Sequence, residues 1–228
     1  AVSRADRHVD RASTNPLEWL LAHGLLAVAD PGHVVLPLEV GLWLRGGTAV
    51  DTGDSEPPQL HRTDRAPQLV GRVAGSAAAE LLRLVGELGD AWGLTPPPVL
   101  RSGGLGVREL RRTATTLDVD DELAAFVVEL AFTAGLVADD GEVGPSWAPT
   151  PGFDVWTDEP PGRRWQHLAE WWLAGTRVAG LVGSRDDRGS ARNALSADVD
   201  RAVAREARLD VLRELAGAGD GAAVDSES

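Results

Sequence analysis

The chain has 228 residues, 43% of them apolar, and a formal net charge of -13 at pH 7. This length and apolar content suffice for one to three compact units. All 22 basic residues are Arg, and the chain contains no Lys and no Cys. The absence of Cys excludes disulfides, cysteine zinc sites and thiol nucleophiles. The absence of Lys excludes a standard phosphate-binding P-loop.

The sequence predicts a protein that does not cross a membrane. Its longest apolar stretch, residues 123–138, is interrupted by Glu129, and the chain does not start with a signal-peptide pattern. We therefore expect a cytoplasmic location. Because Met is absent throughout, we also expect the chain to be an internal segment of a longer protein.

The first ordered signals lie near the start of the chain. Asn15 is a good helix cap and Pro16 suits the first helical position, while Gly24 is suited to ending the helix. Two short apolar runs then flank the turn sequence at residues 29–32, which predicts a β-hairpin. A short helix is expected at residues 38–44.

A second series of elements begins at Pro67, which opens a long helix with apolar residues at spacings of three and four. Helices at residues 107–117 and 120–134 are separated by a short break, as in a helix-turn-helix. Apolar runs around the turn at residues 139–141 predict a wing. The same order of helix end, apolar run and turn occurs in the first series, which indicates tandem winged-helix-like units.

Two further helices are expected near residues 161–174 and 198–216, joined by an Arg-rich loop. Trp165 and Trp172 share a helical face and are predicted to pack in the core, whereas Trp171 points elsewhere. The predicted fold class is mainly α with small β-hairpins (α+β), with tandem winged helix-turn-helix-like units and a C-terminal helical region. The predicted order is a linker (1–14), a first winged-helix-like unit (15–62), a long helix with a second winged helix-turn-helix (63–160), a C-terminal helical region with the Arg-rich loop (161–216) and a flexible tail (217–228).

Motifs for catalysis are not found in the sequence. The glycines at residues 103–106 do not make a dinucleotide loop, because Glu109 stands where a third Gly belongs and no strand precedes them. A flexible lead-in to the following helix is the better interpretation. The five His show no metal-ligand spacing, and no Gly-x-Ser-x-Gly elbow occurs. We therefore expect no catalytic residues, no metal, no cofactor and no small-molecule substrate, so that the chain is not an enzyme.

Charge is distributed unevenly along the chain. Residues 118–160 hold eleven Asp or Glu and no Arg, whereas residues 65–117 hold seven Arg against four acids. The helix at 120–134, in the position of a recognition helix, offers no Arg, Lys, Asn or Gln to read bases. Its acidic side chains would face phosphates without a compensating cation. Reading of the major groove by this helix is therefore disfavoured.

Two Arg clusters are the candidate nucleic-acid contacts. Burial of one face of the helix at 107–117 should turn its Arg side chains outward, close to Arg101, and a second cluster lies in the loop that joins the last two helices. An alternative is that both clusters are solvated faces paired with nearby carboxylates. A second alternative is a protein interaction scaffold that docks a basic partner through residues 118–160 and does not contact DNA. The candidate residues are Arg101, Arg108, Arg111, Arg112, Arg185, Arg188 and Arg192.

Three stretches, at residues 15–47 (NPLEWLLAHGLLAVADPGHVVLPLEVGLWLRGG), 96–120 (PPPVLRSGGLGVRELRRTATTLDVD) and 180–196 (GLVGSRDDRGSARNALS), resemble a known family. It is that of helicase-associated domain proteins of high-GC bacteria, which are related to the XPB-type helicase N-terminal domain. The resemblance implies an internal segment, accessory to DNA unwinding or repair, whose partners are DNA and other domains of the parent chain. It supplies no catalytic residues, and ATPase motifs are not found at matching positions.

Overall fold

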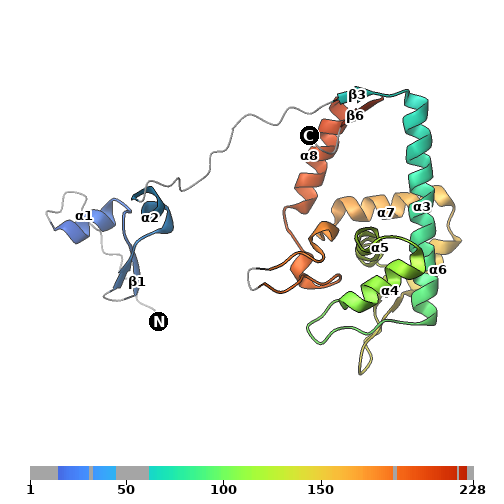
Figure 1. The fold of residues 1–228 in the computed structure, drawn as a ribbon, viewed down its shortest axis with the longest axis horizontal. Coiled ribbons are helices and arrows are strands. Elements are labelled where there is room, and N and C mark those ends of the chain that lie inside the picture. The colour runs from blue at the N-terminus through green and yellow to red at the C-terminus, as the bar shows by residue number, and fades with distance from the viewer. Residues whose placement is uncertain (1–14, 31–32, 45–61, 187–188, 220, 225–228) are drawn as a thin grey trace. The chain divides into compact units, whose positions relative to one another are not determined.

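The computed structural model describes residues 15–30, 33–44, 62–186, 189–219 and 221–224. The chain divides into two compact units, Ala1–Gln59 and Leu60–Ser228. Within the described residues, eight α-helices and three antiparallel strand pairs give a mainly helical α+β architecture (Figure 1). The predicted fold class is confirmed at this level. None of the described helices is both long and apolar enough to cross a membrane. The predicted linker at residues 1–14 lies outside the described residues.

The first unit has a helix, a hairpin and a second helix, in the predicted order. Helix α1 (Pro16–Ala22) is capped by Asn15, whose Oδ1 accepts the Leu17 N–H at 3.0 Å. Strand β1 (Ala27–Asp30) pairs with β2 (His33–Val35), and α2 (Leu38–Leu44) follows. Of the described side chains and glycines in this unit only Gly41 is buried, and Trp43 is 73% exposed. The described part of this unit therefore has no core of its own.

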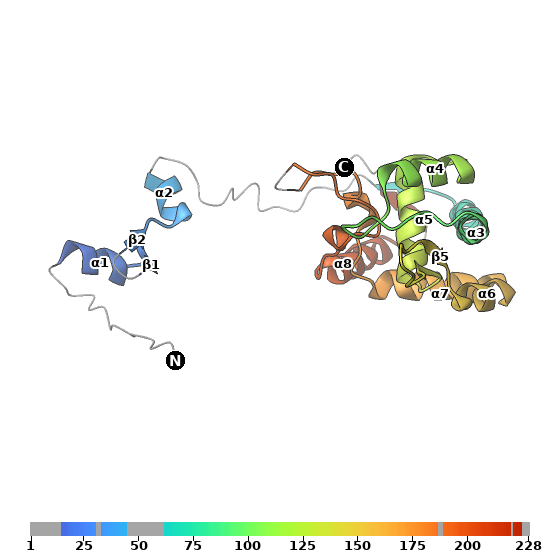
Figure 2. The ribbon, with the colours of Figure 1, turned by 90° about the horizontal axis from the view of Figure 1, so that it is seen from below.

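The second unit is built around α5 (Asp121–Thr133), which lies among α3 (Pro67–Leu94), α4 (Val107–Leu117) and α7 (Pro161–Ala174) (Figures 1 and 2). Asp120 caps α5 by accepting the Leu123 N–H at 2.7 Å. Most of α5 faces inward because its sequence is apolar on nearly every side. The core side chains that meet it include Leu84, Val85, Leu88 and Trp92 of α3, Leu110, Ala114 and Leu117 of α4, and Leu168 of α7.

A hairpin of β4 (Val137–Asp139) and β5 (Trp147–Pro149) follows α5, with Ala138 opposite Ala148. The segment before α4 pairs with the same hairpin, because the Trp147 N–H donates to the Pro97 carbonyl and the Val99 N–H to the Pro145 carbonyl, each at 2.8 Å. Residues 97–99 thus add a short third strand segment. The order of elements is α3, this segment, α4, α5, β4 and β5.

Helix α6 (Pro151–Asp158) is present although the sequence does not predict it. Its Pro-Gly start is typical of a turn, and only the spacing of Phe153 and Trp156 indicates a helix. Both rings are buried. Phe153 lies against α3 at Gly89, where an added Cβ would come within 2.1 Å of the ring, so the close approach of α6 requires glycine at this position.

One segment near the C-terminus differs from expectation. Strand β6 (Ala222–Val224) pairs with β3 (Arg62–Asp64), and the Arg65 N–H donates to the Gly221 carbonyl at 2.7 Å, although a flexible tail is predicted there. The pairing partner lies so far away in the sequence that local composition cannot indicate it.

The prediction that Trp165 packs in the core is wrong, because its side chain is 41% exposed. Trp172 does pack against the core as predicted, and Trp171 is exposed. Only Leu168 of α7 is fully buried. The apolar face of α7 is thus fully buried at Leu168, partly buried at Trp172 and exposed at Trp165.

Truncation of Leu88, which is 0% exposed, should create a cavity between α3 and α5. We expect Leu88→Ala to lower the free energy of unfolding by about 2–5 kcal/mol, measured by urea denaturation. The matched control on the same helix is Leu94→Ala, because Leu94 is 87% exposed; it should change stability by less than about 0.5 kcal/mol. Equal losses for the two variants would contradict the assignment of the core.

Candidate nucleic-acid interface

The outer face of α4 carries a row of three exposed Arg side chains, here called the α4 arginines: Arg108, Arg111 and Arg112. Burial of Leu110 and Ala114 turns them outward, as predicted. Arg111 Nε lies 3.4 Å from Asp121 Oδ2, and Arg112 Nη1 lies 3.5 Å from Glu109 Oε2. Both Arg side chains are mostly exposed, so solvent screens these ion pairs and they are weak. The α4 arginines therefore remain available to a ligand.

Arg101 is also exposed, in the turn that leads into α4. This turn is held in place and is not the flexible lead-in that the glycines suggest. Gly104 is buried, and the Leu105 N–H donates to the Ala194 carbonyl at 2.7 Å. An added Cβ on Gly104 would lie 2.8 Å from that same carbonyl. Glycine at this position lets the turn approach the chain at residue 194.

The second cluster lies on a small loop closed by its own backbone. The Gly183 N–H donates to the Arg192 carbonyl at 2.9 Å, and the Arg192 N–H donates to the Ser184 carbonyl at 2.8 Å. Arg192 is partly buried, and its Nη1 donates to Ser184 Oγ at 3.0 Å and to the Arg185 carbonyl at 2.5 Å. Arg185 is exposed, and its Nη1 donates to the Gly189 carbonyl at 2.5 Å. The predicted site residue Arg188 lies outside the described residues.

A groove of about 430 Å³ separates α4 from this loop and is here called the α4–loop groove. Arg111 lines it from α4 and Arg192 lines it from the loop, so the structure brings one member of each predicted cluster to the same groove. Asp121 and Glu122, at the start of α5, also line it. Arg112 instead lines a separate hollow of about 290 Å³ beside α3. The remaining lining of the α4–loop groove is mostly apolar: Leu105, Val107, Leu110, Ala125, Ala179, Val182, Ala191 and Ala194.

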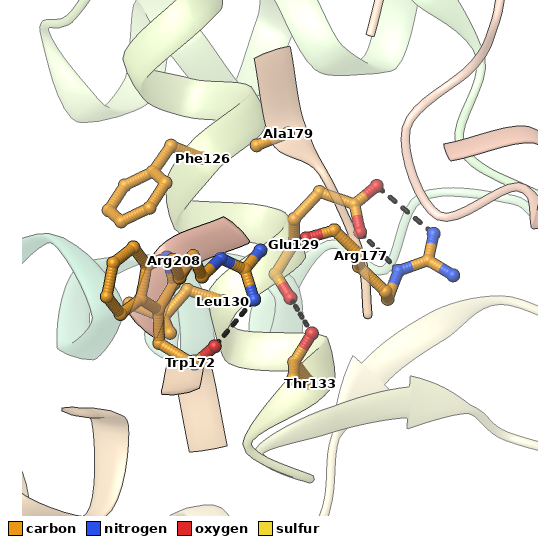
Figure 3. A pocket seen from close by; sticks show the side chains of 8 residues that line it. All are labelled: Phe126, Glu129, Leu130, Thr133, Trp172, Arg177, Ala179 and Arg208. Atoms are coloured by element: carbon orange, nitrogen blue, oxygen red, sulfur yellow. Dashed lines mark hydrogen bonds and ion pairs between the residues drawn. The ribbon is translucent and has the colours of Figure 1, made fainter. Parts of the chain in front are cut away.

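Glu129 of α5 forms a buried ion pair with Arg177 (Figure 3). Their side chains are only 3% and 12% exposed. The Leu195 N–H also donates to Glu129 Oε1 at 2.6 Å, and Arg177 Nη2 donates to the Ser196 carbonyl at 2.8 Å. The ion pair thus ties residues 175–182 and 193–199, here called the covering segments, to α5.

Arg208 of α8 (Ala204–Gly217) fastens the same region from the other side. Its Nη1 donates to the carbonyls of Trp172 and Gly175, each at 2.6 Å, and its guanidinium lies 4.9 Å from the Trp172 ring centroid. Burial lowers the pKa of Arg208 from its ordinary value. The cavity among these side chains measures only about 30 Å³, which suits a single water and no larger ligand. We conclude that the bonds of Glu129, Arg177 and Arg208 hold the covering segments against α5 and do not form a ligand site.

Sequence reasoning missed this network. It treats Glu129 as one of the acidic side chains that α5 would present to DNA, whereas the structure buries Glu129 and pairs it with an Arg 48 residues later. Arg177 and Arg208 carry no local signal, because their partners are backbone carbonyls and a distant carboxylate. An Asp or Glu inside a strongly apolar helix is the one available hint, since such a charge requires a partner when it is buried.

Other carboxylates of residues 118–160 also have structural partners. Asp139 Oδ1 accepts the Gly141 N–H, and Asp140 Oδ1 accepts the N–H groups of Glu142 and Ser146, each at 3.1 Å. Within the described ranges there is no group of three or more His, Cys, Asp or Glu placed to hold a metal ion. The acidic residues are divided among the α4–α5 turn, α5, the β4–β5 hairpin, and α6 with the residue that follows it.

Comparisons with family models, curated proteins and solved structures found no match to this chain. The geometry of the site therefore carries the functional argument.

Removing one partner of the buried ion pair should be costly, because the other charge is left buried. We expect Glu129→Ala to lower the free energy of unfolding by about 3–5 kcal/mol. The paired change Glu129→Leu with Arg177→Met should recover only part of that loss, because the Leu195 N–H and the Ser196 carbonyl lose their side-chain partners. Asp210→Ala breaks the exposed Arg213–Asp210 pair and should cost less than about 1 kcal/mol. Equal destabilisation by Glu129→Ala and Asp210→Ala would show that the pair does not hold the covering segments.

Proposed function

We propose that this chain is a non-catalytic accessory module of a helicase-like DNA-processing protein, and that it binds nucleic-acid phosphates. The observation that carries the proposal is the α4–loop groove, which Arg111 lines from α4 and Arg192 lines from the loop. The exposed Arg101, Arg108 and Arg185 lie on the elements that border it. Phosphate contacts of this kind supply most of the affinity in sequence-independent binding.

The order of elements supports a winged helix-turn-helix in the second unit. A helix (α3), a short strand segment, two helices (α4 and α5) and a hairpin (β4 and β5) follow one another as they do in that motif. In the first unit, the described residues place one helix on each side of a hairpin. A winged-helix-like unit at residues 15–62 stays a prediction.

The contact that we propose differs from that of a usual winged helix. Helix α5, which corresponds to the recognition helix, is largely buried and carries no base-reading side chain. Because phosphate contacts position a protein without reading sequence, we propose binding that is independent of sequence. The resemblance of the three sequence stretches to helicase-associated domain proteins supports an accessory role. With no P-loop lysine in the sequence, we propose that this chain does not hydrolyse ATP.

The alternative function is a scaffold that docks a basic protein through residues 118–160. Glu129 is buried in an ion pair with Arg177 and so is withheld from such a partner. The exposed acids that remain belong to separate elements. We therefore favour the α4–loop groove as the functional surface.

Binding of the full chain to DNA should weaken steeply with salt. We expect each of Arg108→Ala, Arg111→Ala and Arg192→Ala to reduce the slope of log K against log salt by up to about one unit, measured by fluorescence anisotropy. Arg213→Ala is the matched control, because Arg213 is equally exposed and paired with an acid but lies on α8. It should leave the slope unchanged. Absence of binding at low salt, or an equal effect of Arg213→Ala, would contradict the proposal.

A further inference from the structure

We infer that the α4–loop groove holds a single nucleic-acid strand in preference to a duplex. This inference rests on the proposed function, because it names the ligand class of the same site. It follows from three features of the second unit: the chemistry of the groove floor, the burial of α5 and the charge of the hairpin tip.

The apolar part of the groove lining, here called the floor, is accessible at Val107, Val182 and Ala191. Arg111 lines the groove from α4 and Arg192 lines it from the loop. A duplex presents mainly phosphates at its surface and stacks its bases inside, so it has little apolar surface to place on such a floor. An unpaired strand can direct phosphates to the two arginines and lay base and sugar faces on the floor. The groove therefore matches an unpaired strand.

The features that let a winged helix hold a duplex are missing here. The covering segments lie on α5 and are tied to it through Glu129, so α5 cannot enter a major groove without unlocking them. The tip of the β4–β5 hairpin carries Asp139, Asp140 and Glu142, all exposed. These carboxylates would repel the phosphates of a duplex that reached across from α4.

Asp121 and Glu122 give the groove an acidic end. Asp121 competes with phosphate for Arg111, to which it is already paired at 3.4 Å. Carboxylates also accept hydrogen bonds from exocyclic amino groups of bases, and on the Watson–Crick edge only an unpaired strand has these groups free. The acidic end thus repels phosphates but can accept hydrogen bonds from the amino groups of unpaired bases.

The test compares a 20-nucleotide single strand of mixed sequence with the same strand in a duplex, both bound to the full chain at low salt. We expect about tenfold tighter binding of the single strand, the gain from burying roughly 55 Å² of apolar base and sugar surface on the floor. Asp121→Asn should tighten binding, because it frees Arg111. Val107→Ser, at the exposed edge of the floor, should weaken binding of the single strand and leave that of the duplex unchanged.

A variant that fills the groove locates the site. Ala191 is exposed and lines the groove, so Ala191→Trp should abolish the preference for the single strand. The matched control is Ala216→Trp at an exposed position of α8, which should retain it. Circular dichroism and the melting temperature establish that both variants are folded, and Val107→Ser provides a second, smaller change at the same groove.

The outcomes separate this inference from the proposed function. Equal or tighter binding of the duplex overturns the single-strand inference but leaves phosphate binding standing. Absence of binding to both probes overturns both. A preference for the single strand that survives Ala191→Trp and Val107→Ser places the strand elsewhere and overturns the assignment to the α4–loop groove.

Discussion

The buried ion pair between Glu129 and Arg177 sets the arrangement of the second unit. It joins the middle of α5 to segments that follow α7, and the same carboxylate also accepts the Leu195 N–H. Residues 193–194, adjacent to that bond, line the α4–loop groove, and the Ala194 carbonyl accepts the Leu105 N–H. One carboxylate therefore fixes both the cover on α5 and the position of the groove's far wall.

An apolar cover would bury the same face of α5 without the desolvation of two charges. A buried ion pair is often no more stable than a well-packed apolar replacement, but it accepts only one geometry. In this unit the covering segments contain little regular structure, only the short 3-10 turns Ala179–Leu181 and Ala197–Val199. Such segments could slide on an apolar helix. The directional bonds of Glu129 and Arg177 fix their register, and this explains why a charge is placed inside an otherwise apolar helix.

Helices with strong end signals could be predicted from the sequence, and contacts between distant residues could not. Asn15, Pro67 and Gly135 mark helix ends by local chemistry, and the structure places the ends within a residue or two of them. Strand β6 depends on β3 and has no local signal, while α6 has only the spacing of Phe153 and Trp156 and depends on a glycine of α3 for its close packing. For the candidate site, the periodicity of α4 predicts which arginines face outward. Only the three-dimensional fold shows that Arg111 and Arg192 share a groove.

The net charge of -13 is that of the whole chain, whereas local potential depends on where charges lie. Glu129 is withdrawn from the surface by burial and by its ion pair with Arg177, and the groove lining combines two arginines with Asp121 and Glu122. The side chains of the two groove arginines also differ in how firmly they are held before a ligand binds. Arg192 is held by Ser184 Oγ and the Arg185 carbonyl, so little of its side-chain entropy remains to be lost on binding. Arg111 is held only by an exposed Asp121. A phosphate that binds at α4 thus has only to replace Asp121 as the partner of Arg111. Arg192, on the loop side of the groove, is already held in position.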